Sequence, residues 1–176
     1  MVRAEDKTIL VVDDEPNVRD YLKMVLEDAG FNVITACDGV EALEIIKMKN
    51  PDFISLDLIM PKKSGHKLLH ELRKDKELSR IPVLIVTAHA RDELGKGDLE
   101  DILENSVMSG PGIYLEKPVS PTTYVHNIQR VLGIEPAEET MDRISLKEEL
   151  QKSLQNADPA ALREALKALK KEKKDT

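Results

Sequence analysis

The stretch that decides the fold is Lys7-Thr-Ile-Leu-Val-Val-Asp-Asp-Glu-Pro16. Its first six residues are largely apolar and rich in β-branched side chains, which predicts a buried strand at 7–12. The following stretch, 17–29, carries apolar residues at helical spacing, and Pro16 stands where the first turn of a helix tolerates proline. Gly30 follows as a stop signal. The chain therefore opens with one predicted strand and one predicted amphipathic helix.

The alternation of strand and helix continues to residue 132. Further strands are predicted at 31–35, 52–56, 82–86 and 112–115, and further helices at 39–48, 65–76, 98–108 and 121–132. Strands that alternate with helices form a parallel sheet covered by helices on both faces, so the predicted class is α/β. Ligands of such proteins bind beyond the carboxyl ends of the strands. We therefore expect the functional side chains at this edge.

Length and composition limit the number of domains and the classes of partner that this chain can have. The 176 residues suffice for one core-bearing domain plus an appendage. Hydrophobic residues make up 41% and charged residues 34%, which is typical of a globular protein. The formal net charge of −7 argues weakly against non-specific binding of polyphosphates, so a nucleic-acid partner is not expected.

Membrane insertion and disulfide bonding are not expected either. The longest apolar runs, 9–12 and 81–86, have the length of strands and are too short to cross a bilayer. No apolar stretch typical of a signal peptide precedes the first strand, and Cys37 is the single cysteine. We therefore expect a cytoplasmic protein without a membrane partner.

Composition changes after Gly133, and we expect the first domain to span 1–134. Residues 135–142 are acidic and include a proline, which predicts a linker, and a short helical extension is expected at 143–176. Its two helical stretches, at about 145–156 and from 158 onward, each carry one stripe of leucines. The stripes consist of Leu146, Leu150 and Leu154, and of Leu162, Leu166 and Leu169. Single stripes cannot form a large core, so these helices must pack on the first domain, on each other or on a partner.

Polar residues gather where the predicted strands end. Asp13 and Asp14 follow the first strand, Asp57 the third, Thr87 the fourth and Lys117 the fifth. Taken singly, each is more often a turn former, a strand residue or a solvated side chain. In a doubly wound sheet, however, these ends converge on one edge. The combination therefore predicts a functional site.

The chemistry of these side chains favours phosphoryl transfer. Three neighbouring carboxylates repel one another unless a cation lies among them. Hard oxygen ligands suit Mg²⁺, which binds through a few carboxylates, waters and a phosphate. A lysine and a threonine opposite would contact phosphoryl oxygens, and aspartate is a known covalent acceptor. We therefore expect Mg²⁺-assisted transfer of a phosphoryl group onto a carboxylate.

Four short motifs resemble those of receiver domains of two-component response regulators. They are Val11-Val-Asp-Asp-Glu-Pro16, Asp57-Leu-Ile-Met-Pro61 with Gly65, Val86-Thr-Ala88 and Lys117-Pro118. The resemblance covers roughly residues 5–133. It implies a flavodoxin-like, doubly wound (βα)5 parallel sheet with strand order 2-1-3-4-5, here followed by a C-terminal α-helical tail.

The resemblance also implies a phosphoacceptor and a metal site. Asp57 would accept a phosphoryl group from a histidine kinase or phosphotransfer protein. Asp14 and Asp57 would bind Mg²⁺ directly, Asp13 would assist through water, and the backbone carbonyl of Ile59 would complete the protein ligands. No cofactor other than Mg²⁺ is implied.

The resemblance further implies which residues contact the phosphoryl group and which residues form the switch. Thr87 and Lys117 would contact phosphoryl oxygens, and Tyr114 matches the aromatic switch position of the family. A phosphoryl group adds negative charge beside Lys117 and an acceptor for the Thr87 hydroxyl. Movement of Thr87 would leave space for Tyr114 and bias a two-state surface. The alternative for Tyr114 is a tyrosine lying on the surface of an edge strand.

Two features depart from the family pattern. Ile59 lies two residues after Asp57, where an apolar side chain should hinder water and give a long-lived phosphoryl group. His89, two residues after Thr87, could act on that water, although a solvated loop histidine is the simpler interpretation. The stretch between Thr87 and Lys117 is longer than usual and rich in glycine and charge, which favours a loop.

The predicted function is a phosphorylation-dependent signalling switch with no external substrate. Its output would be a downstream protein or a self-dimer, reached through the receiver face and the helical tail. One alternative is a transcription regulator whose tail contributes to DNA binding or dimerisation. Another is a Mg²⁺-dependent phosphatase, which would need an acid where Ile59 stands. A third is a flavodoxin, whose phosphate loop would be repelled by Asp13-Asp-Glu15.

Overall fold

A computed structural model describes residues 2–60, 64–87, 114–135, 138–155 and 158. Five strands in this part of the chain form one parallel sheet in the order β2-β1-β3-β4-β5. The strands are β1 (Thr8–Val12), β2 (Asn32–Ala36), β3 (Phe53–Leu56), β4 (Val83–Thr87) and β5 (Tyr114–Glu116). The predicted α/β class and the strand order 2-1-3-4-5 are confirmed.

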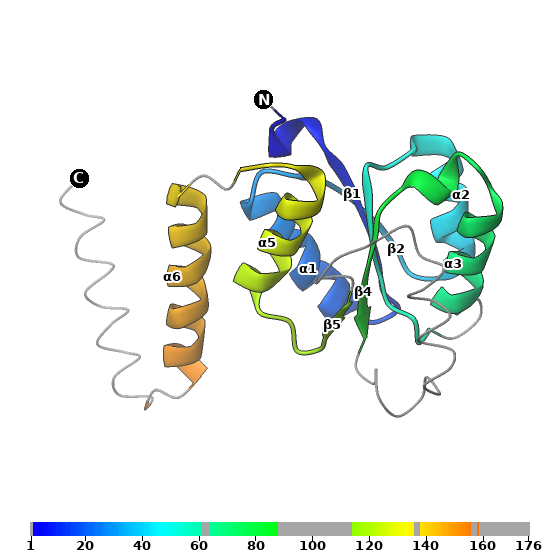
Figure 1. Cartoon of the computed structure of the whole chain (residues 1–176). Helices are drawn as coiled ribbons and strands as arrows, with labels where there is room; N and C mark the ends of the chain where they lie inside the picture. Colours follow the sequence, from blue (N-terminus) through cyan, green and yellow to red (C-terminus); the bar gives the residue numbers. More distant parts are fainter. Residues whose placement is uncertain (1, 61–63, 88–113, 136–137, 156–157, 159–176) are drawn as a thin grey trace.

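Helices cover both faces of the sheet, as Figure 1 shows. One face carries α1 (Pro16–Asp28) and α5 (Pro121–Leu132), and the other carries α2 (Gly39–Lys49) and α3 (Gly65–Lys74). Two short 3-10 helices are η1 (Ala4–Asp6) and η2 (Leu78–Arg80). The helix predicted at 98–108 lies outside the described residues.

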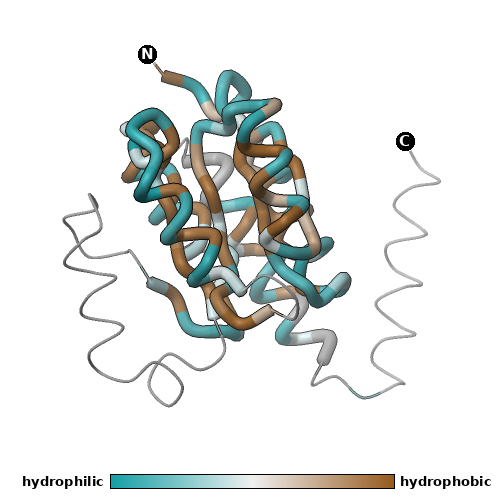
Figure 2. The backbone as a smooth tube through the Cα atoms, turned by 90° about the vertical axis from the view of Figure 1, so that its right-hand side faces the viewer, coloured by the Kyte–Doolittle hydropathy of each residue, from teal (hydrophilic) through white to brown (hydrophobic). Residues whose placement is uncertain are grey.

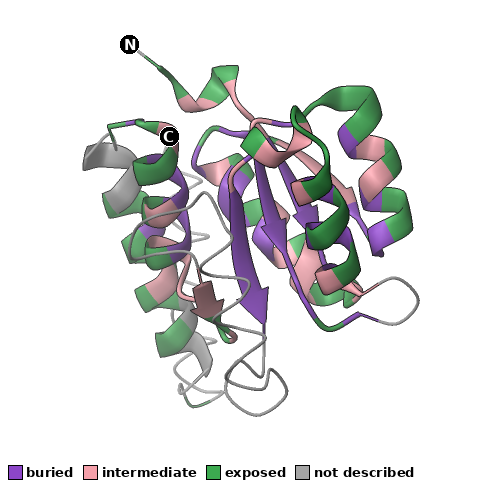
Figure 3. Ribbon diagram, turned by 45° about the vertical axis from the view of Figure 1, so that its right-hand side comes forward, coloured by how far each residue is buried: buried purple, intermediate pink, exposed green. Residues whose placement is uncertain are grey.

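The central strand β1 shows why its sequence is continuously apolar. Ile9 and Val11 pack with α1 and α5, whereas Leu10 and Val12 pack with α2 and α3. All four side chains are buried. A strand that is covered on both faces has no solvent side that would require polar residues. Figure 2 shows the apolar segments gathered inside the molecule, and Figure 3 shows the strands β1, β3 and β4 as its buried centre.

Local signals set the ends of several helices. Pro16 and Pro121 occupy the first turns of α1 and α5. The Asp38 side chain caps α2 by accepting hydrogen bonds from the backbone N–H groups of Val40 and Glu41. Gly133 ends α5 with φ of 65°, a left-handed conformation that favours glycine. The elements begin and end close to the predicted positions, and Pro16 was the start signal used for α1.

The tail begins with a helix that starts earlier than predicted. Helix α6 (Glu138–Gln155) begins inside the stretch 135–142 that the sequence indicates as a linker, so that linker is too long. Burial of Ile144 in the same core cluster as side chains of α1 and α5 holds the helix against these two helices.

The buried side of α6 is not the leucine stripe seen in the sequence. Leu146 and Leu150 are 65% and 59% exposed, whereas Ile144 is only 3% exposed. Ile144 lies two residues before Leu146, which is about 200° around a helix of 3.6 residues per turn. Of the three predicted packing partners, the described part of the first domain therefore does not cover Leu146 and Leu150.

Polar contacts hold α6 against the two helices beside it. Arg143 donates to the backbone carbonyl of Asp28 at the end of α1, and Lys147 pairs with the Asp28 carboxylate. Glu148 accepts hydrogen bonds from Ser120 Oγ at 3.1 Å and Thr122 Oγ1 at 3.2 Å. Helix α6 thus runs antiparallel to α5 on the outer flank of the molecule (Figure 1).

Within the described part of the chain, none of the helices combines the length and apolar character needed to cross a membrane.

Candidate functional site

Two aspartates emerge side by side where β1 and β3 end. Val12 is in register with Leu56, so the next residues of both strands, Asp13 and Asp57, leave the sheet together. The Asp57 N–H donates to the carbonyl of Val12 at 2.9 Å. Both side chains are buried, and Asp14 beside them is half-buried. Carboxylate oxygens of these three aspartates lie within 4.8 Å of one another.

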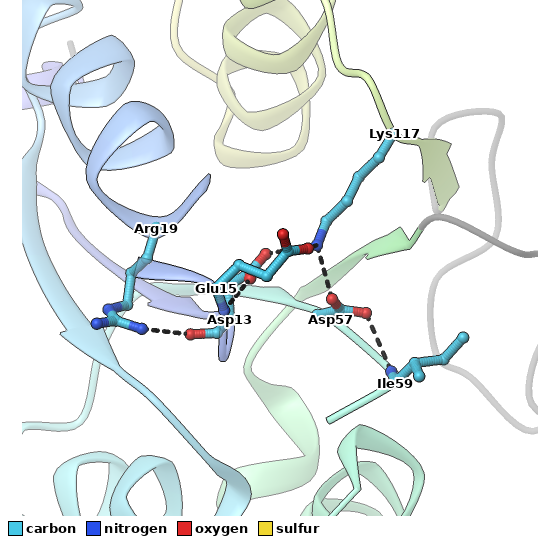
Figure 4. Close-up of polar contacts among 6 residues, drawn as sticks. All are labelled: Asp13, Glu15, Arg19, Asp57, Ile59 and Lys117. Atoms are coloured by element: carbon cyan, nitrogen blue, oxygen red, sulfur yellow. Dashed lines mark hydrogen bonds and ion pairs between the residues drawn. The ribbon is translucent and has the colours of Figure 1, made fainter. Parts of the chain in front are cut away.

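The Lys117 ammonium bridges the two buried carboxylates (Figure 4). Its Nζ lies 2.8 Å from Asp13 Oδ2 and 2.7 Å from Asp57 Oδ2, and a longer contact of 3.7 Å reaches Glu15 Oε1. The backbone positions this side chain, because the Lys117 N–H donates to the carbonyl of Thr87 at 3.0 Å. Three of the five polar residues predicted at the strand ends, Asp13, Asp57 and Lys117, are thus in direct contact.

Burial and ion pairing shift the pKa values of Lys117 and Asp13 in opposite directions. Burial alone would lower the pKa of Lys117, but its hydrogen bonds to Asp13 and Asp57 raise that pKa above the ordinary value. Lys117 therefore stays protonated. Burial raises the pKa of the Asp13 carboxyl, and the bond to Lys117 offsets part of this rise. Lys117 therefore opposes the effect of burial on the Asp13 carboxyl.

Backbone donors fix the other oxygen of each carboxylate. The Ile59 N–H donates to Asp57 Oδ1, and the Glu15 N–H donates to Asp13 Oδ1, both at 3.0 Å. Arg19 Nη1 donates to the backbone carbonyl of Asp13 at 2.7 Å (Figure 4). Sequence reasoning missed the contact of Arg19, because nothing in its spacing sets it apart from other cations on a helix.

Thr87 ends β4 at the same edge and is fully buried. Its hydroxyl oxygen has no hydrogen-bond partner among the described residues. A buried hydroxyl without a partner is destabilising, by about 1–3 kcal/mol. The fold tolerates this cost at the edge where a phosphoryl oxygen would supply the missing partner.

Tyr114 lies on β5, where it is in register with Ile85 of β4. Its side chain is half-buried and packs against the core cluster on the α2–α3 side of the sheet. It is therefore not a tyrosine lying on the surface, but its role as a switch stays a prediction. His89 lies outside the described residues.

The donor set suits a hard divalent cation. Asp13, Asp14 and Asp57 offer carboxylate oxygens only, and such ligands hold Mg²⁺ or Ca²⁺ in proteins. Lys117 already neutralises part of their charge. The predicted contribution of the Ile59 carbonyl stays a prediction, although Ile59 lies at the rim and its N–H already contacts Asp57.

Gly65 has a steric role that its place in a motif did not reveal. A Cβ added to this residue would lie 2.1 Å from the carbonyl oxygen of Asp57 and 2.7 Å from Cα of Leu58. The Gly65 N–H also donates to the carbonyl of Leu58 at 3.1 Å. The start of α3 therefore presses against the backbone that carries the phosphoacceptor candidate, and only a residue without a side chain fits there.

The chain belongs to the receiver-domain family of response regulators, because residues 9–129 match the family model described as the response regulator receiver domain. Proteins of this family act in two-component signalling. Helix α6 lies beyond the matched residues.

Curated relatives fall into two groups by length. The "Polar-differentiation response regulator DivK" of Brucella ovis is 32% identical over 127 residues, which cover 72% of this chain and 97% of DivK. The "Probable transcriptional regulator ycf27" of Cyanophora paradoxa is 38% identical over 126 residues, which cover 72% of this chain and 48% of that protein. The chain thus spans about half the length of the ycf27 relatives that it matches.

Solved structures agree with the fold. The Vibrio cholerae chemotaxis protein CheY4 is similar with a TM-score of 0.61 and 30% identity, over 71% of this chain and 98% of CheY4. The receiver domain of a histidine kinase from Syntrophus aciditrophicus is similar with a TM-score of 0.61 and 27% identity, over 75% and 95% of the two chains.

Replacement of Gly65 by alanine tests the close approach of α3. We expect Gly65→Ala to lower the free energy of unfolding by about 3 kcal/mol, because the clashing atoms belong to the backbone and cannot rotate away. Urea denaturation measures this change. Gly133→Ala is the matched control: its Cβ meets no atom within 4 Å, and the left-handed φ alone costs about 1 kcal/mol. Equal losses for both variants would contradict the steric role.

Proposed function

We propose that this chain is a phosphorylation-dependent switch in which Asp57 accepts a phosphoryl group. The observation that carries the proposal is the Lys117 ammonium, held within 2.8 Å of both Asp13 and Asp57 at the carboxyl edge of the sheet. The buried, unpartnered hydroxyl of Thr87 supports it, because a phosphoryl oxygen would satisfy that group.

On this chain, the transfer would use the Asp57 carboxylate as acceptor and Asp13, Asp14 and Lys117 around it. The donor is a phosphohistidine of a histidine kinase or phosphotransfer protein. An oxygen of Asp57 attacks phosphorus, the N–P bond breaks, and the histidine nitrogen keeps the electron pair. Mg²⁺ bound by Asp13, Asp14 and Asp57 would neutralise charge on the carboxylates and the phosphoryl oxygens. Lys117 then exchanges a carboxylate oxygen for a phosphoryl oxygen.

The substrate of this chemistry is Asp57 itself, so we do not propose an enzyme with an external substrate. Under this proposal the chain works in the cytoplasm, where histidine kinases draw on ATP. Hydrolysis of the acyl phosphate returns the switch to its resting state. Ile59, 40% exposed at the rim, places an apolar side chain beside Asp57, and we propose that it slows this hydrolysis.

Helix α6 is the output element that the contacts favour. Lys117 is followed three residues later by Ser120, which donates to Glu148 of α6, as does Thr122. A change of partner at Lys117 therefore shifts residues 117–122, and this short segment also contacts α6 through Ser120 and Thr122. A partly open pocket of about 60 Å³ lies between α1, α5 and α6 and is lined partly by Tyr21, Met24 and Ile144. We propose that phosphorylation changes the docking of α6.

A transcription regulator is the second candidate. The ycf27 relatives carry that description, and this chain spans about half their length. The tail from Glu135 onward holds nine basic and ten acidic residues, so it is not a cationic arm. DNA binding that weakens steeply with salt would favour this candidate over a switch that acts on proteins.

Acetyl phosphate with Mg²⁺ tests the phosphoacceptor. We expect intact mass spectrometry to show one added phosphoryl group on the wild-type chain and none on Asp57→Asn, because an amide is not a nucleophile of comparable strength. Asp20→Asn, at an exposed position of α1, is the matched control and should be labelled like the wild type. Retention of the added mass in Asp57→Asn would overturn the assignment.

The lifetime of the phosphoryl group tests the role of Ile59. We expect Ile59→Asn to lose the phosphoryl group severalfold faster than the wild type, because an amide can hold a water molecule beside the acyl phosphate. Ile59→Val keeps an apolar side chain and should remain slow. The time course of mass loss after removal of acetyl phosphate gives the rates. Identical rates for all three chains would contradict the proposal that Ile59 slows hydrolysis.

The Glu148 contact tests the proposed output. Burial alone would raise the pKa of Glu148, but hydrogen bonds from Lys152, Ser120 and Thr122 hold it below its ordinary value of 4.5. A depressed pKa means that this stabilisation is present above pH 4.5 and is lost as the pH falls below it. We therefore expect hydrogen-exchange protection of α6 to decrease below pH 4.5 in the wild type, and this pH dependence to vanish in Glu148→Gln.

The same measurement shows whether α6 responds to Asp57. Phosphorylation should change the protection of α6 in the wild type and in Glu149→Gln, an exposed control next in sequence, but much less in Glu148→Gln. Identical protection of α6 with and without phosphorylation would contradict the proposed output and leave the phosphoacceptor assignment intact.

A further inference from the structure

The outer side of α6 carries an exposed leucine edge, which we define as Leu146 and Leu150. These side chains are 65% and 59% exposed and point away from the side that holds Ile144 in the core. Helix α6 is on the outer flank of the molecule, with α5 on its inner side (Figure 1). Large apolar side chains repeated at helical spacing on an exposed helix typically mark an interface.

The sequence after α6 contains a matching stretch. Residues 159–176 carry Leu162, Leu166 and Leu169 at helical spacing, and Asp158 followed by proline is typical of a helix start. This stretch lies outside the described residues, and only residues 156–158 separate it from α6. Connections of two to eight residues commonly join neighbouring antiparallel helices, so the spacing suits a helical hairpin.

We propose that the leucine edge of α6 binds residues 159–176 of the same chain as an antiparallel helix. The position of the connection sets which residues of the two helices lie opposite one another. Leu150 and Leu166 are nearly equidistant from it, as are Leu146 and Leu169. An antiparallel pair would therefore bring the leucines of the two stretches opposite one another.

Charge complementarity supports the same pairing. Residues 138–155 contain five acidic and three basic residues, a formal charge of −2. Residues 159–176 contain six basic and three acidic residues, a formal charge of +3. Asp142 and Glu149 flank the leucine edge on α6 and are exposed. A cationic partner helix is therefore favoured over a second α6, which would bring like charges together.

Tethering favours the same chain over a second copy. A connection of three residues gives the attached segment an effective concentration in the millimolar range. The leucine edge has only two described leucines, which is far less apolar surface than a stable dimer interface provides. The other side of α6 is already occupied by the receiver domain through Ile144. In this arrangement α6 holds the receiver domain with one side and the end of the chain with the other.

Disulfide trapping in the full-length chain tests the pairing. Cys37→Ser removes the native thiol, and Leu146→Cys with Leu169→Cys then places one thiol on each stretch. Ser145→Cys with Leu169→Cys is the matched control, because residue 145 is about 100° away around α6. We expect an intramolecular disulfide to form roughly tenfold faster in the first pair, because the tether is shared by both pairs but only the first places its thiols facing one another across the proposed contact. The proposal does not depend on phosphorylation of Asp57.

Two outcomes would overturn the proposal. Equal rates for both pairs would mean that residues 159–176 do not lie on the leucine edge. Disulfide-linked dimers that grow with protein concentration would assign the edge to a second copy of the chain.

A second measurement avoids cysteine altogether. Leu166→Asp puts a charge into the proposed contact, whereas Ala168→Asp adds the same charge about 200° away around the proposed helix. We expect faster hydrogen exchange of the amides at 142–155 in Leu166→Asp than in Ala168→Asp, and a monomeric chain in both. Identical exchange in these two variants would contradict the hairpin.

Discussion

The rest of the site depends on one cation, the Lys117 ammonium between the carboxylates of Asp13 and Asp57. Carboxylates at neighbouring strand ends repel one another unless a cation lies between them. The Lys117 Nζ fills this place, at 2.8 Å from Asp13 Oδ2 and 2.7 Å from Asp57 Oδ2. Lys117 is itself held through its backbone to Thr87, the end of the neighbouring strand. The sheet register thus creates the electrostatic arrangement.

Rigid backbone surrounds the candidate acceptor. The Asp57 N–H bonds to β1, the Ile59 N–H bonds to its carboxylate, and Gly65 lies against its carbonyl group. Such support fixes the carboxylate at the edge where Asp13, Asp14 and Lys117 converge, and fixed charges act most strongly where they cannot relax. Thr87 is the exception, because its buried hydroxyl still lacks a partner among the described residues.

Helix α6 connects this site to the part of the chain that lies beyond the family match. Ser120 and Thr122 stand shortly after Lys117 and hold Glu148, while Asp28 at the end of α1 holds Arg143 and Lys147. Helices α1 and α5, which lie next to the site in the chain, therefore also contact α6. An element tied to both is sensitive to small shifts between them, which is why the proposed function gives the output to α6.

The sequence by itself determined the strand and helix alternation, the strand order implied by the receiver motifs, and which polar residues stand at the strand ends, because local periodicity and strand ends dictate which side chains meet at one edge. It did not reveal the contact of Arg19 or the steric demand on Gly65, since these depend on distances between segments far apart in the chain. The start of α6 and its buried side were also decided by tertiary structure. By hydropathy alone, the three leucines predict the buried face of α6. The surface of α1 and α5 and the ion pair at Asp28 instead place Ile144 in the core, because stability depends on the contacts that the helix actually makes.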